Sequence, residues 1–232
     1  YQVTAGQGRI GQFSFLVLMF FLMIVGIIYV EQGQRRIPIQ FAKRVRGRKV
    51  MGGQSTYIPL KVNSAGVIPV IFATSVLFFP ALIATSLPQD NSITAGIRNW
   101  IDVNLANSQG TSWFYIFFLG MLIIFFTYFY TTIQFDPVRQ SDMIRRQGGF
   151  VPGVRPGIST TNYLSHIISR ITLPGSVFLA SVAVLPSIAS AIWDIPLGFS
   201  GISILITVGV ALETMKQIES QLSMRNYEGF ID

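Results

Sequence analysis

The first residues whose type and spacing could support chemistry are three glycines near the start of the chain. Gly6, Gly8 and Gly11 have the spacing of a dinucleotide-binding fingerprint, and Glu31 follows at the distance of the acid that binds a ribose hydroxyl. In that fingerprint the helix after the glycines keeps a polar face toward water. Here the stretch that follows, 13–30, is apolar on every side. We therefore expect a flexible loop leading into a membrane helix rather than a nucleotide site.

Side chains suited to catalysis or metal binding are scarce. His166 is the single histidine, and the chain contains no cysteine. One imidazole without thiolates cannot build the usual metal clusters or a nucleophile relay. The acidic residues lie in polar segments or at the ends of apolar stretches, not in facing pairs within them. We expect neither an enzyme activity nor a cofactor or metal.

The polar segment 31–61 predicts a β-hairpin. Ile37 and Ile39 alternate with polar residues, a second apolar pattern follows at Tyr57 and Leu60, and glycines lie between the two runs. Two runs with a period of two, separated by turn-forming residues, are typical of paired strands. A connection of this length between apolar stretches is usually functional. We expect the hairpin to project from the membrane.

A second polar segment, 136–170, holds Arg155 between the pairs Pro152-Gly153 and Pro156-Gly157. Proline fixes its own φ angle, and glycine adopts the conformations that tight turns require. The two pairs therefore fix the backbone on both sides of Arg155 and hold this residue at a tip. The residues alone leave two interpretations open, an ordinary turn or an arginine presented to a partner.

Five apolar stretches must position these polar segments. Each can supply the roughly 18–20 apolar residues with which a helix crosses a bilayer. Backbone groups in hydrocarbon cannot bond to water, so these stretches must be helical. We predict an all-α membrane protein whose transmembrane helices span 13–30, 62–87, 113–135, 171–193 and 199–218.

Charge differs sharply between the connecting segments. Thirteen of the 17 lysine and arginine residues lie in 31–61 and 136–170, whereas 88–112 contains only Arg98. The positive-inside rule places such basic segments in the cytoplasm. We expect 31–61, 136–170 and the tail after the last helix to be cytoplasmic. A net charge of +7 concentrated on one side suits anionic lipid, RNA or an acidic protein surface.

This orientation puts the remaining segments on the external side. They are the stretch that leads into the first helix (1–12), the long connection after the second helix (88–112) and the short connection after the fourth helix (194–198). The tail after the last helix, 219–232, is expected on the cytoplasmic side. No signal peptide pattern precedes the first helix. We therefore expect this sequence to be the C-terminal part of a larger membrane protein, preceded by an odd number of spans.

Three segments resemble the SecY family, the central subunit of a protein-conducting channel. They are EQGQRRI at 31–37, STYIPLKVNSAGVIPVIFA at 55–73 and FVPGVRPG at 150–157, with further similarity at 201–206. They follow the order of the family's second half, spans six to ten. The resemblance implies a clamshell of two five-helix halves related by an inverted repeat. This chain would then form one half, and the pore would lie between the two.

The resemblance also implies roles for individual residues. The pore ring would include Ile71 and Ile206, although helix packing alone could explain both. The lateral gate, through which apolar segments leave sideways, would include Asn63, Ser75 and Phe79, and the two polar residues could instead bond neighbouring helices. Docking of a motor or a ribosome would use basic residues of the two basic segments, namely Arg35, Arg36, Arg48, Lys49 and Arg155.

The implied partners follow from the same resemblance. They are the N-terminal half of the channel, small SecE- and SecG-type membrane subunits, a SecA-type ATPase or a ribosome, the translocating polypeptide and anionic lipid. The implied location is a bacterial plasma membrane. One alternative is half of an inverted-repeat secondary transporter, but the apolar stretches hold no mid-span ionisable residue. A passive scaffold would leave the two arginine-bearing segments without a role.

Overall fold

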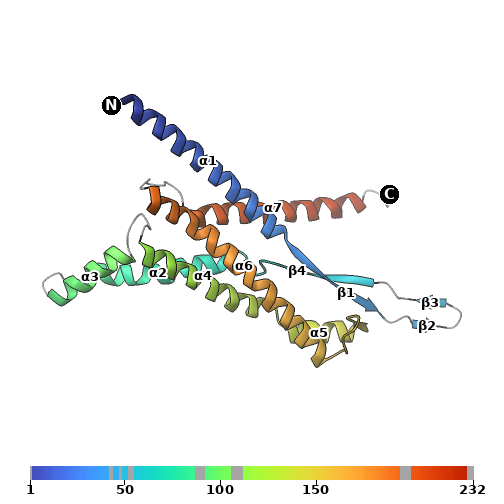
Figure 1. Ribbon diagram of the computed structural model, residues 1–232. Coiled ribbons are helices and arrows are strands. Elements are labelled where there is room, and N and C mark those ends of the chain that lie inside the picture. Colours follow the sequence, from blue (N-terminus) through green and yellow to red (C-terminus); the bar gives the residue numbers. More distant parts are fainter. Residues whose placement is uncertain are drawn as a thin grey trace.

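The computed structural model describes residues 2–41, 44–46, 49–51, 55–86, 92–105, 112–193 and 200–228. Its helices are α1 (Gln2–Gln32), α2 (Ile68–Ser86), α3 (Ser92–Asn104), α4 (Trp113–Gln134), α5 (Pro137–Arg146), α6 (Ile158–Trp193) and α7 (Gly201–Glu228). Its strands are β1 (Gln34–Phe41), β2 (Arg44–Arg46), β3 (Lys49–Met51), β4 (Ser55–Lys61) and β5 (Gly149–Phe150). Figure 1 shows the elongated arrangement that these elements form.

Five helices in the described part of the chain, α1, α2, α4, α6 and α7, are long and apolar enough to cross a membrane. This confirms the predicted class. The helices and the expected spans differ at their ends. The helix α2 begins only at Ile68, because the preceding residues form bends in which Gly66 has φ of 65°. The helix α6 starts at Ile158, and α3 is an additional helix.

The expected flexible loop at the start of the chain is wrong. Gly6, Gly8 and Gly11 lie within α1, which is continuous from Gln2 to Gln32. A glycine inside a helix costs only about 1 kcal/mol relative to alanine, so three of them need not interrupt it. A helix in place of the strand and turn that the dinucleotide fingerprint requires also excludes that type of site.

The main core lies between the spans and is lined by small side chains where helices approach closely. Helix α6 packs along α4 and contributes Ala180 and Ala183 to this core. A Cβ atom at Gly175 would lie 2.8 Å from the carbonyl oxygen of Val62, so the segment before α2 lies directly against α6. Small residues at helix contacts are typical of membrane bundles, where close van der Waals packing holds helices together.

A proline in α6 shapes the start of α7. Pro186 lacks an N–H, so the carbonyl of Val182, four residues earlier, has no helical donor. Gly201, the first residue of α7, lies directly against this carbonyl, and any side chain there would collide with it. The start of the last helix therefore depends on a glycine at this contact.

The two basic segments are joined by one β-sheet. Strands β1 and β4 pair antiparallel, with Ile37 opposite Ile58, which confirms the predicted hairpin. On its other edge β1 pairs with β5, so that Phe41 lies opposite Gly149. In Figure 1 this sheet extends from one end of the bundle and α3 lies at the other. We call the end that carries the sheet and α5 the basic end.

The sheet packs on α5 and α6 through a second, separate core, which we call the loop core. Its buried members come from β1, β4, α5, the segment after β5, and α6, and they are Ile37, Ile39, Leu60, Ile144, Val151, Leu164 and Ile167. Burial of these apolar side chains fixes the position of the hairpin relative to the helices. The hairpin is thus a packed part of the fold.

The packing around Gly149 gives a first prediction. A Cβ atom at this position would lie 3.0 Å from Cγ2 of Ile39, 3.1 Å from Cε1 of Phe41 and 3.2 Å from Cγ2 of Ile144. We expect Gly149→Ala to lower the free energy of unfolding by about 1–3 kcal/mol, the usual cost of overpacking. Thermal unfolding of the purified protein measures it. Gly96→Ala, inside α3 with no atom within 4 Å of the new Cβ, is the control and should raise the free energy of unfolding by up to about 1 kcal/mol. An equal loss in both variants would contradict the prediction.

Candidate channel face and basic surface

Helix α2 carries three predicted site residues on one face. Ile71, Ser75 and Phe79 are spaced four residues apart, so they lie above one another along the helix. All three are exposed, Ile71 by 42%, whereas the adjacent Val70 is 0% exposed and belongs to the main core. The Ser75 hydroxyl donates to the carbonyl of Ile71 at 2.8 Å, so it bonds within its own helix. The structure therefore brings these three residues together on an accessible face.

The second predicted ring residue, Ile206, comes from α7. Its neighbours Ile204 and Leu205 are buried in the main core, whereas Ile206 is half-buried and lies outside that cluster. Each predicted ring residue is thus adjacent to a fully packed residue but is itself turned partly out of the core. Both positions thus carry aliphatic side chains that remain partly accessible, as do many other apolar residues of these helices.

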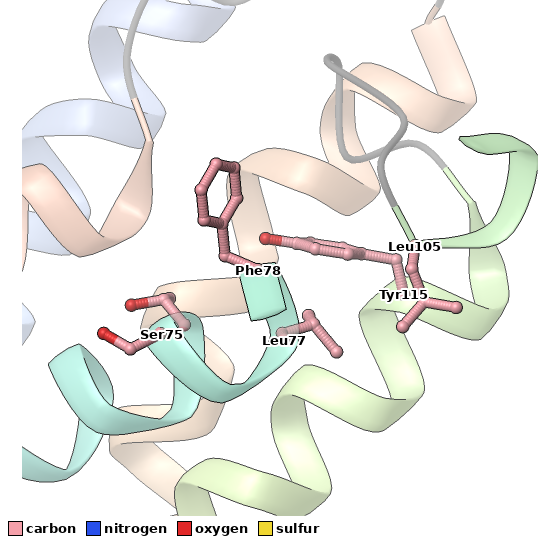
Figure 2. Close-up of a pocket in the computed structure, with 6 residues that line it drawn as sticks. Ser75, Leu77, Phe78, Leu105 and Tyr115 are labelled. Carbon is pink, nitrogen blue, oxygen red and sulfur yellow. The ribbon is translucent and has the colours of Figure 1, made fainter. Parts of the chain in front are cut away.

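A cavity of about 350 Å³ lies beside the α2 face, between α2, α3 and α4. Its lining includes Ser75, Leu77 and Phe78 from α2, and Tyr115 from α4. Figure 2 shows Ser75, Leu77, Phe78 and Tyr115 around this cavity. Its described lining combines apolar side chains with the hydroxyl groups of Thr74, Ser75 and Tyr115.

The third predicted gate residue, Asn63, lies apart from this face, in the segment between β4 and α2. It is 4% exposed, and its side-chain amide donates to Oε2 of Glu31 at 2.9 Å and to the carbonyl of Gly66 at 3.2 Å. Its Oδ1 atom is buried and has no partner among the described residues. Asn63 thus ties the end of α1 to the start of α2 and retains one unused acceptor.

Two of the predicted docking arginines, Arg35 and Arg36, are exposed consecutive residues of β1 and therefore lie on opposite faces of this strand. The Arg36 guanidinium is 4.8 Å from the centre of the Tyr57 ring on β4, a cation–π contact that holds it against the hairpin. Arg35 is exposed and lines a hollow with Tyr29 and Gln34. The sequence analysis did not identify Tyr57 as a contact of Arg36. An aromatic residue opposite a basic strand could have indicated this contact.

The remaining docking residues differ in what the structure describes. Lys49 belongs to β3, where its backbone pairs with Arg46. Arg48 lies outside the described residues. Arg155 is exposed in the turn after β5.

The predicted turns around Arg155 are present. Val154 donates its N–H to the Val151 carbonyl at 3.1 Å, and Gly153 has φ of 82°, as in a type II turn with proline at its second position. On the other side Gly157 has φ of 110°. The Arg155 carbonyl accepts the Thr160 hydroxyl at 2.9 Å. The backbone at Arg155 is therefore fixed while its side chain stays in solvent.

The Gly157 carbonyl anchors the same turn to α5. It accepts a hydrogen bond from the buried Ser141 hydroxyl at 3.1 Å. Together with the β1–β5 pairing, this contact holds Arg155 and the hairpin arginines in one rigid surface. That arrangement could not be read from the spacing of the basic residues.

The five span-length helices of the described residues, with a basic sheet at one end, define a multi-pass membrane protein. The SecY sequence profile matches residues 2–215. The chain belongs to the SecY family.

Named relatives support the same conclusion. A protein of Streptomyces scabiei called "Protein translocase subunit SecY" is 49% identical over 226 residues, covering 95% of this chain and 49% of the relative. The protein of the same name in Thermus thermophilus is 46% identical, covering 98% of this chain and 52% of the relative. This chain therefore spans about half the length of the curated relatives it matches.

Solved structures agree at the level of the fold. A structure titled "The structure of a protein conducting channel" matches with a TM-score of 0.54 and 16% identity, over 88% of this chain and 48% of that chain. A second structure, of a SecY protein and its plug domain, matches with the same TM-score at 17% identity, over 88% of this chain and 49% of that chain. The helices of this chain are therefore arranged as in SecY channels.

The Glu31–Asn63 contact gives the second prediction. Glu31→Ala removes the acceptor of a buried amide, which we expect to cost about 1–3 kcal/mol of unfolding free energy. Glu31→Gln keeps a side-chain oxygen that can accept from Asn63, so it should retain most of the stability. The midpoint of thermal unfolding distinguishes the two variants. If Glu31→Gln lost as much stability as Glu31→Ala, the carboxylate charge and not the hydrogen bond would be responsible.

Proposed function

We propose that this chain forms one half of a protein-conducting membrane channel. The observation that carries the proposal is the accessible apolar face of α2 at Ile71, next to the fully buried Val70, in a chain of the SecY family. An enzyme would need a polar, convergent site. A channel half needs a face that stays accessible in the isolated half and becomes the pore lining when the other half is added.

The proposed barrier is an apolar constriction made in part by Ile71 and Ile206. Branched aliphatic side chains offer water no hydrogen-bond partners, so the constriction dewets and blocks ions. Such side chains make no directional bonds, and a passing polypeptide of any sequence can displace them. The channel itself would catalyse no reaction, and the energy for transport would come from its cytoplasmic partner.

The proposed lateral gate involves α2, with Ser75 and Phe79 on its accessible face and Asn63 at its base. An apolar segment could leave into the lipid if α2 separated from the other half of the channel. The unused Oδ1 acceptor of Asn63 supports this role, because a donor from the missing half could pair with it when the gate is closed. Glu31 would then orient the Asn63 amide by holding its nitrogen.

The proposed docking surface is the basic end, which would face the cytoplasm of a bacterium. Arg35, Arg36 and Arg155 project from a sheet and turn that are packed on α5 and α6, and Lys49 and Arg48 belong to the same segment. Arginine forms bidentate bonds with carboxylates and phosphates. A SecA-type ATPase or the RNA of a ribosome would offer such groups, and anionic lipid would lie nearby. The other partners would be the N-terminal half and SecE- and SecG-type subunits.

The ring assignment is tested by making the constriction polar. We expect the double substitution Ile71→Asn and Ile206→Asn in the full channel to raise the resting ion conductance on the order of tenfold. This corresponds to lowering the free-energy barrier for ion passage by about 1.4 kcal/mol. Polypeptide transport should persist, because the pore is not narrowed. Single-channel recording in planar bilayers measures the leak. The control pair, Leu22→Asn and Met121→Asn, alters exposed apolar residues of α1 and α4 and leaves α2 and α7 unchanged. Equal leakage from the control pair would show a general packing defect and overturn the ring assignment.

The docking role of Arg155 is tested by charge reversal. Its side chain is exposed and its backbone is held by other residues, so Arg155→Glu should leave the unfolding temperature nearly unchanged. Transport driven by the cytoplasmic partner should be lost, because a carboxylate repels the acidic groups that arginine binds. Vesicle import assays measure it. Arg98→Gln, at the opposite end of the molecule, should transport normally. Normal transport by Arg155→Glu would rule out the docking role.

A further inference from the structure

A cavity of about 260 Å³ lies between α4, the start of α5 and α6, near the basic end of the bundle. Most of its lining side chains carry hydroxyl groups, namely Tyr128, Thr131, Thr132, Ser165, Ser169 and Thr172. The other lining residues are apolar, and none of the described residues that form the wall is charged. Neither the proposed pore nor the proposed docking surface uses this cavity.

Thr131 distinguishes this cavity from a packing gap. It is 4% exposed, and its hydroxyl has no hydrogen-bond partner among the described residues. Other threonine hydroxyls nearby are satisfied within their own helices: Thr127 donates to Ile123 at 2.7 Å and Thr172 donates to Ile168 at 2.8 Å. The Thr131 hydroxyl therefore opens onto the cavity with its hydrogen-bonding capacity unused by the described residues, and it is available to a hydrogen-bonding group that enters the cavity.

The position of the cavity along the helices indicates its depth in a membrane. It lies at the last turns of α4, which ends at Gln134, and beside the polar first part of α6. Tyr128, whose hydroxyl is 3.4 Å from the Ser169 carbonyl, belongs to its wall. Tyrosines are enriched where lipid headgroups meet the hydrocarbon. The cavity is therefore at the level of lipid headgroups and glycerol backbones.

Exposed apolar side chains adjoin the hydroxyl-lined wall. Phe129 precedes Thr132 by three residues, and Leu173 follows Ser169 by four, so each lies about one helical turn from a lining residue and on a similar side of its helix. Both are exposed. A polar hollow bordered by apolar side chains matches a lipid, whose headgroup and acyl chains would contact the two surfaces respectively.

We propose that this cavity binds the uncharged, hydroxyl-rich headgroup of a glycolipid, with the Thr131 hydroxyl as its main buried contact. Sugar hydroxyls both donate and accept, as do the six hydroxyls of the wall. A phosphate would find no cation in the wall to neutralise it. The proposal is independent of the transport function, since the residues of the cavity wall belong to neither the proposed pore nor the proposed docking surface.

The test compares lipids retained by the full natural protein. The protein is reconstituted in phosphatidylcholine nanodiscs containing a minor fraction of glucosyl-diacylglycerol, and retained lipid is measured by native mass spectrometry. We expect selective retention of the glucosyl lipid. Thr131→Val, which keeps the side-chain shape, should lower retention about three- to tenfold, as expected for one lost hydrogen bond. Thr127→Val is the matched control, because Thr127 is 2% exposed on the same helix but lies outside the cavity wall.

A second variant keeps the proposal testable if Thr131→Val fails to fold. Ser165→Leu fills the cavity from an exposed position and should also reduce retention. Three results would overturn the proposal: glucosyl lipid held no better than phosphatidylcholine, equal retention of phosphatidylglycerol, or an equal loss in Thr127→Val. Free methyl glucoside that bound as tightly as the lipid, with the same dependence on Thr131, would overturn the assignment to a lipid.

Discussion

The pairing of β1 with β5 is the contact on which the polar half of the structure depends. It joins two strands between which the described chain forms four helices, α2 to α5, and it aligns Phe41 with Gly149. The pairing needs a glycine, because Ile39, Phe41 and Ile144 fill the space that a side chain would take. Without this contact the hairpin would be tied to the bundle only through the loop core and its own ends. With the β1–β5 pairing, the described arginines of both basic segments are carried by one packed unit.

Residues at the base of the hairpin also connect it to the membrane-spanning helices. Glu31, at the end of α1, accepts a hydrogen bond from Asn63, and Lys61 lies 3.9 Å from Glu213 on α7. The ion pair is about half exposed and contributes little by itself. The buried Asn63 contact is stronger, since its amide cannot turn to water. A partner that moves the hairpin would therefore act on the ends of α1 and α2 directly, through bonds that already exist.

The sequence allows the spans and the hairpin to be predicted because both follow from local periodicity. Apolar length alone indicates five spans, and alternation at Ile37 and Ile39 indicates a strand. Contacts between distant segments are not encoded in this way: β5 has two residues, and Asn63 meets Glu31 across 32 positions. The glycines at the start of the chain were misread for a related reason. Their spacing suggested a loop, but three glycines cost less than a helix gains from continuous backbone hydrogen bonds.

Exposed apolar surface on a membrane helix can contact either lipid or another part of a channel. The two faces of this bundle differ in how their hydroxyl groups are bonded. On α2, Ser75 lies between Ile71 and Phe79 on the accessible face, and its hydroxyl is satisfied by its own helix. Such a face tolerates water on opening and needs no ligand. On α4 and α6, hydroxyls gather in a hollow, and Thr131 is left without a partner. That face offers hydrogen-bonding groups to an occupant. In our proposals the first face would line the channel and the second would hold the headgroup of a lipid.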